Sequence, residues 1–129
     1  MSVSGDGGYD EVVDGVTQAG DTSTVCAVMA AGNANDHRRA TRERPPADAI
    51  AAGEVRNLDL LRLTVGEGPD AEVRYARSYI GVGLTPIVAI DLEKGGKPTP
   101  LQLDSEVLTV DAGTRVLVEI APGALSTVG

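Results

Sequence analysis

A chain of 129 residues is long enough for one domain, or for two small parts that share a core. Its 19 acidic and 11 basic residues give a net charge of −8, which argues against sequence-independent nucleic-acid binding because no basic stripe can displace counterions from phosphates. No apolar stretch approaches the about 18 residues of a membrane-spanning helix, and residues 1–8 lack the basic and apolar character of a secretion signal.

The composition also limits the core and the surroundings. There is no Phe or Trp and there are only three Tyr, so the core must be built from aliphatic side chains, which bury less area than rings. Two lysines, nine arginines and the acidic excess favour a halophilic protein in a salt-rich cytoplasm, with an ordinary acidic bias as the alternative. Cys26, the single cysteine, lies in an apolar run, which indicates a buried thiol in a reducing, cytoplasmic compartment.

The first 53 residues alternate between strand and helix patterns. We expect the end of a strand at 1–3, a glycine-rich turn at 4–8, a helix from Tyr9 to a C-terminal Gly20, a strand at 24–30, a turn at 31–34, a polar helical stretch at 35–44 and a short helix at 47–52 closed by Gly53. This order predicts an α/β part with a parallel sheet, which binds a nucleotide at the C-terminal ends of its strands.

The pattern changes after Gly53, and we place a boundary near residues 53–57. The two predicted parts are therefore a nucleotide-binding α/β part at 1–53 and a β-rich part at 54–129. Short apolar segments separated by Gly, Pro and Asp turns predict an antiparallel sheet or half-sandwich, with strands at 58–63, 73–76, 87–92, 101–103, 107–110 and 116–120.

Two turns in the first part have the composition of an anion site. The first, with the helix start that follows, contains Ser4, Gly5, Asp6, Gly7, Gly8, Asp10 and Glu11. The second contains Gly32, Asn33, Asn35 and Asp36. Glycines let a backbone approach a ligand closely, and free N–H groups at a helix start point at an anion. One such cluster is more often only a tight turn, but two at the same edge of a parallel sheet predict a nucleotide cleft.

These motifs resemble, in the same order, those of the diacylglycerol kinase catalytic family of diacylglycerol and sphingosine lipid kinases. Residues 4–15 are similar to its Gly-Gly-Asp-Gly-Thr…Asn-Glu-Val-Val…Gly phosphate loop, and residues 32–36 to its Gly-Thr-x-Asn-Asp turn. Four later segments resemble its strand into the second domain, its Gly-Phe-Gly segment, its Leu-Asp-Gly-Glu turn and its Pro-x-Ala-Leu segment: 53–63, 79–83, 101–106 and 121–125.

The resemblance implies a shortened lipid-kinase architecture that uses ATP and Mg²⁺ to phosphorylate a lipid or other small hydroxyl substrate, in transient contact with a membrane surface. The matched nucleotide-site positions are Gly5, Asp6 and Gly7 in the phosphate loop, Glu11 at its acidic position, and Asn35 and Asp36 in the second turn. Glu106 matches the catalytic residue that takes the proton from the attacking hydroxyl, a role suited to a positioned carboxylate. The metal ligands are left unassigned.

Several positions depart from the family pattern. Ser4 replaces a Gly, Gly8 replaces a Thr hydroxyl, and Asp10 replaces an Asn and adds negative charge near the phosphates; Asn33 and Ser105 also differ. The family's section before the first loop, and most of its strands before the Leu-Asp-Gly-Glu turn, have no counterpart in the sequence. A non-catalytic remnant or partner of a full-length kinase is therefore the alternative, and an NAD kinase-like enzyme, sharing the first loop only, is the third.

Two further expectations concern the surface. The arginines of the polar stretch either contact phosphate or form a solvated cationic face, and the second interpretation is preferred: Arg38, Arg39, Arg42 and Arg44. The exposed edges of a shortened sheet favour pairing between two copies, and hence a homodimer.

Overall fold

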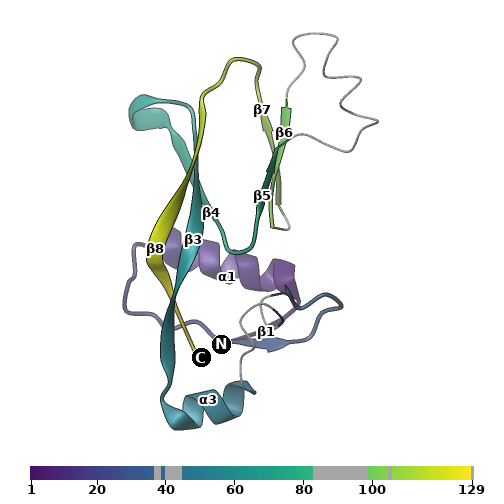
Figure 1. The fold of residues 1–129 in the computed structure, drawn as a ribbon, viewed down its shortest axis with the longest axis vertical. Coiled ribbons are helices and arrows are strands. Elements are labelled where there is room, and N and C mark those ends of the chain that lie inside the picture. Colours follow the sequence, from purple (N-terminus) through teal and green to yellow (C-terminus); the bar gives the residue numbers. More distant parts are fainter. Residues whose placement is uncertain (37–38, 40–44, 83–98, 105, 129) are drawn as a thin grey trace.

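The computed structural model describes residues 1–36, 39, 45–82, 99–104 and 106–128. Its first part is a small α/β unit (Figure 1). Strands β1 (Ser2–Ser4) and β2 (Val28–Ala30) pair in parallel, and helix α1 (Asp6–Gln18) lies between them in the chain. The predicted parallel pairing is confirmed, although β2 is shorter than the apolar run at 24–30.

Helix α1 begins earlier than predicted. Gly7 and Gly8, expected in a turn, lie inside its first turn, and only Gly5 precedes it in extended conformation. Asp6 favours the positive end of the helix dipole, which partly offsets the low helix propensity of the two glycines. The helix ends where Gly20 takes a positive φ of 66°, as predicted for this glycine.

Helix α3 (Pro46–Ala52) confirms the predicted short helix. Gly53 closes it with a φ of 66°, donating its N–H to the Ile50 carbonyl. Of the polar stretch before it, Asp36 and Arg39 are helical, and the other arginines named above lie outside the described residues. No helix within the described residues combines the length and the apolar character that crossing a membrane requires.

Antiparallel strands make up the second part, as predicted. Strand β3 (Val55–Val65) pairs with β4 (Glu72–Ala76) on one side and with β8 (Val116–Val128) on the other, and a 3₁₀ turn, η1 (Gly68–Asp70), joins β3 to β4. A second three-stranded sheet has the order β5 (Ile80–Val82), β6 (Thr99–Leu103) and β7 (Glu106–Val110). The strand predicted at 87–92 lies outside the described residues.

Strand β8 is longer than the strand predicted at 116–120, because a bulge lets it continue past Pro122. Its register with β3 shifts between Leu58 and Leu60, and Gly123 takes a positive φ of 59°. The Asp59 carboxylate accepts a hydrogen bond from the Gly123 N–H at 2.7 Å. The segment that resembled a Pro-x-Ala-Leu motif is therefore part of a strand.

Two clusters of buried side chains hold the molecule together. One packs the two antiparallel sheets against each other and is aliphatic, as the composition predicts: Leu63, Ala76, Leu101, Leu103 and Val110. The other packs α1 and β2 onto the lower half of β3 and β8: Tyr9, Val13, Cys26, Val28, Leu60 and Leu125. The two predicted parts therefore share this second cluster.

The end of β8 ties that shared cluster to the α/β unit. Cys26 donates its N–H to the Ser126 carbonyl and accepts from the Val128 N–H, at 2.8 and 2.9 Å, so this strand also borders the residues that lead into β2. Cys26 is 3% exposed, and burial raises the pKa of its thiol. The prediction of a buried cysteine is confirmed.

Candidate functional site

The start of α1 provides the donors that an anion site needs. Tyr9 donates its N–H to the Gly5 carbonyl at 3.2 Å, which is the first hydrogen bond of the helix. The N–H groups of Gly7 and Gly8, in the first turn, precede this bond and have no acceptor within the helix. They also lie at the positive end of the helix dipole. The phosphate loop predicted from the sequence is thus a helix start rather than a long turn.

The second glycine turn packs directly against the first. Because β1 and β2 are parallel neighbours, their C-terminal ends meet, with Ser4 opposite Ala30. The backbones of Gly5 and Gly32 then come so close that a Cβ on Gly32 would lie 2.6 Å from the Gly5 Cα. Glycine is required at Gly32 for this reason. The predicted meeting of two turns at one sheet edge is observed.

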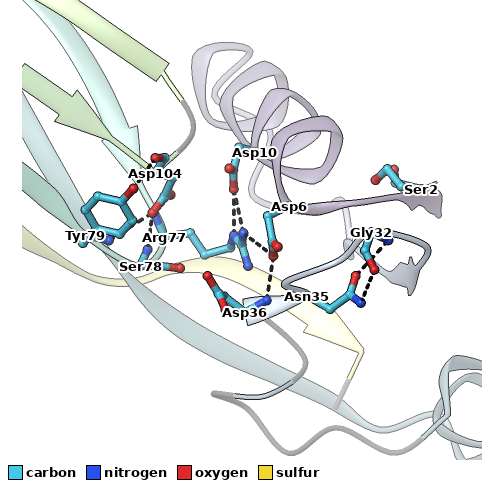
Figure 2. A network of polar contacts seen from close by, with 11 residues as sticks. Ser2, Asp6, Asp10, Gly32, Asn35, Asp36, Arg77, Ser78, Tyr79 and Asp104 are labelled. Atoms are coloured by element: carbon cyan, nitrogen blue, oxygen red, sulfur yellow. Dashed lines mark hydrogen bonds and ion pairs between the residues drawn. The ribbon is translucent and has the colours of Figure 1, made fainter.

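Asn35 fixes the shape of the second turn. Its side chain accepts from the Gly32 N–H at 3.0 Å and donates to the Gly32 carbonyl at 2.6 Å. Its own φ is 51°, a left-handed conformation that asparagine tolerates better than most residues. Next to it, Asp36 donates its N–H to Asp6 Oδ1 at 2.8 Å (Figure 2). Asp6 therefore ties the second turn to the first turn of α1.

Arg77, which belongs to none of the sequence motifs, joins this region to the β-rich part. It follows β4 directly, and its guanidinium lies between two carboxylates of α1 (Figure 2). Nε donates to Asp10 Oδ1 at 2.9 Å, and Nη2 lies 2.8 Å from the same oxygen and 3.4 Å from Asp6 Oδ1. The guanidinium carbon also lies 5.1 Å from the centre of the Tyr9 ring.

A sequence signal for this contact did exist. Asp6 and Asp10 are four residues apart, so they share a face of α1, and that face also carries the buried Tyr9. Two carboxylates beside a buried ring need a cation, because unpaired buried charge is costly. The sequence does not say which arginine meets this need, since Arg77 is 67 residues away from Asp10.

Asp104 holds the segment that carries Arg77. Its carboxylate accepts the backbone N–H groups of Arg77, Ser78 and Tyr79 at 2.6, 2.9 and 3.0 Å. The Tyr79 hydroxyl donates to the Asp104 carbonyl at 2.7 Å, and Asp104 itself has a φ of 44°. This carboxylate, part of the motif that resembled Leu-Asp-Gly-Glu, therefore has a structural role in positioning Arg77.

Glu106, two residues later, lies at the rim of a hollow of about 330 Å³. Its lining combines the first loop and α1 with the sheet edge: Gly7, Asp10, Glu11, Asp14, Tyr75, Leu103 and Glu106. The predicted catalytic residue and three predicted phosphate-loop residues thus face one space. The volume is at the lower end of the range for ligand pockets.

Other predicted site residues do not line this hollow. Ser4 Oγ lies 2.6 Å from Ser2 Oγ, and Ser4 contributes to a separate space of about 10 Å³, room for about one water, with Gly5, Asp6 and Asn35. Asn33 is exposed on the second turn and lines neither space. Ser105, one of the departures from the family pattern, lies outside the described residues.

The described residues could hold a magnesium ion only if phosphates of a bound ligand supplied some of its ligands. Among them, no group of three or more His, Cys, Asp or Glu side chains is arranged to hold a metal. Mg²⁺, however, is commonly bound by one or two carboxylates together with substrate phosphates and waters. Asp14 suits this role, because its Oδ1 is buried at the hollow without a hydrogen-bond partner in the described part of the chain.

No family model, curated protein or solved structure matches the chain. The lipid-kinase resemblance therefore depends on the sequence motifs alone.

Proposed function

We propose that this chain binds Mg·ATP at the first turn of α1 and transfers the terminal phosphoryl group to a lipid hydroxyl, as a shortened relative of the diacylglycerol kinase family. One observation carries the proposal: Glu106 and the phosphate-loop residues Gly7, Asp10 and Glu11 line the same hollow. The family's chemistry needs its acidic residue and its phosphate loop at one place, and these motifs are at opposite ends of this chain. Their meeting supports a shared function.

The arrangement suits phosphoryl transfer, in which positioning and charge neutralisation do most of the work. The N–H groups of Gly7 and Gly8 would donate to phosphate oxygens. The close contact of Gly5 with Gly32 leaves no side chain over the backbone at the place where the phosphates would lie. Glu106 would accept the proton of the attacking hydroxyl. The oxygen–phosphorus bond to the lipid forms as the bond to ADP breaks, and ADP leaves with its negative charge.

Magnesium would supply charge neutralisation on the phosphates when it is bound. Glu11 and Asp14 are one helical turn apart on the face of α1 that lines the hollow, so they are the carboxylates that would hold it.

The direct test is transfer of labelled phosphate from ATP to diacylglycerol or sphingosine in mixed micelles, at high salt. Glu106→Gln keeps the side-chain shape and removes the base, so we expect a loss of about 10²- to 10⁴-fold in kcat. Glu119→Gln, on the exposed face of β8, is the matched control and should retain the wild-type rate within about twofold. Equal rates for wild type and Glu106→Gln would contradict the assigned role of Glu106.

A non-catalytic nucleotide-binding protein is the second candidate, and the Arg77 contacts favour it. Asp6 and Asp10 are already engaged by a guanidinium, and Gly8 offers no hydroxyl to a phosphate. ATP binding by the wild type without phosphate transfer to any lipid would identify this candidate. The NAD kinase-like alternative is less well supported, because it does not account for Glu106 at the hollow.

A further inference from the structure

Arg77 is a buried cation in an acidic neighbourhood. Its side chain is 4% exposed, whereas Asp6 and Asp10 are 23% and 15% exposed. The hollow that Asp10 lines is also lined by Glu11, Asp14 and Glu106. A polyphosphate that approaches the first turn of α1 would therefore meet strong repulsion unless local positive charge offsets it.

We propose that Arg77 is the residue that allows this acidic site to accept a polyphosphate. It neutralises and positions the two carboxylates that flank the first turn of α1, Asp6 and Asp10. The inference rests on the proposed nucleotide binding. It adds a reason why the acidic site tolerates the negative charges of its ligand, and why affinity depends on the number of phosphates.

The orientation of the guanidinium supports this role. Nε and Nη2 both contact Asp10, so Nη1 lies on the edge that points away from Asp10 (Figure 2). Nη1 is buried and has no hydrogen-bond partner within the residues that the structure describes. Because Nη1 is buried, Arg77 would act on a ligand through its charge rather than by direct contact, from a position where water and salt screen that charge weakly.

The segment that carries Arg77 is already fixed before any ligand arrives. Asp104 accepts three consecutive N–H groups from residues 77–79, and the Tyr9 ring lies against the guanidinium. Arg77 therefore lies where it is needed without further ordering, and preorganised groups bind more tightly because less freedom is lost on binding.

The test is isothermal titration of the full chain at high salt with AMP, ADP and ATP, each with Mg²⁺. For wild type we expect affinity to rise with each phosphate. Arg77→Gln should weaken ATP binding by about 10- to 100-fold and AMP binding by less than about threefold, because the lost charge acts on the added phosphates. Arg77→Lys keeps the charge, so its ATP affinity should lie between those of wild type and Arg77→Gln. Arg115→Gln removes an exposed arginine directly before β8, and its affinities for the three nucleotides should match those of wild type.

A merely structural arginine would give a different pattern. Equal losses for AMP and ATP in Arg77→Gln, or no loss for either, would overturn the inference while leaving nucleotide binding intact. Wild type that binds none of the three nucleotides would instead overturn the proposed function on which the inference rests.

Asp10→Asn provides an independent measurement if Arg77→Gln does not fold. The amide oxygen still accepts from Arg77 Nε, but the negative charge is removed, so the guanidinium charge acts more fully on the ligand. We expect ATP to bind about threefold to tenfold more tightly, with a smaller change for AMP. An unchanged ratio of the two affinities would contradict the inference.

Discussion

Two arginines at opposite ends of the β-rich part contact acidic side chains in very different surroundings. Arg77, after β4, is 4% exposed between Asp6 and Asp10, whereas Arg115, before β8, is 64% exposed and lies 3.0 Å from Glu67. Water and salt screen the exposed pair, so it contributes little to stability. The buried arginine holds α1 against the β-rich part. Burial, rather than the presence of an ion pair, therefore distinguishes the candidate site from the rest of the charged surface.

The largest effect should follow from breaking the buried contact. Arg77→Met fills the space but removes the guanidinium that contacts Asp6 and Asp10. We expect the free energy of unfolding to fall by about 3 kcal/mol, at the low end for a buried pair because both carboxylates are partly exposed. Guanidinium or urea unfolding monitored by circular dichroism measures this. A loss below about 1 kcal/mol would mean that the contacts of Arg77 with Asp6 and Asp10 do not hold α1 against the β-rich part.

Local chemistry made the glycine turns and most strands predictable. Gly32 lies where the backbone closely approaches another segment, and Gly53 lies where the backbone is left-handed. Both situations favour glycine, so the glycines in the sequence indicate where the turns lie. Short apolar segments bounded by turn residues likewise predicted β3 and β4. Gly7 and Gly8 were misassigned to a turn because their low helix propensity was outweighed by packing of the rest of α1.

The long-range part of the site could not be predicted in the same way. Arg77 reaches Asp10 only because β4 ends beside α1, and nothing local to Arg77 indicates that neighbour. The role of Asp104 is similar: its carboxylate binds backbone groups more than twenty residues earlier. The motif resemblance predicts that Glu106 and the first loop belong to one site. Both line the same hollow, and its use as a nucleotide site stays a prediction.

Asp104 offers a way to sharpen the comparison, because it acts on Arg77 through the backbone. Asp104→Asn keeps one acceptor oxygen but loses the charge and the second oxygen, so we expect about 1–2 kcal/mol of destabilisation. Asp70→Asn, in the exposed η1 turn, is the matched control and should change stability by less than about 0.5 kcal/mol. Similar unfolding midpoints for the two variants would contradict a stabilising role for the hydrogen bonds from residues 77–79 to Asp104.

The smallest effect should come from the exposed pair. Arg115→Gln removes the contact with Glu67, and we expect less than about 0.5 kcal/mol of destabilisation, decreasing further as salt is added. Unfolding curves at low and high salt measure both. A loss as large as that of Arg77→Met would contradict the claim that burial makes the Arg77 contacts the stronger ones.

The most direct test of the account follows backbone amide signals by ¹H–¹⁵N NMR while Mg·ATP is added to the full chain. If the phosphates bind at the start of α1, the N–H signals of Asp6, Gly7 and Gly8 should shift most, together with those of Gly32 and Glu106. The amides around Arg115 should remain unchanged. An absence of shifts at millimolar ATP, or shifts confined to residues away from the first turn of α1, would contradict the proposed nucleotide site.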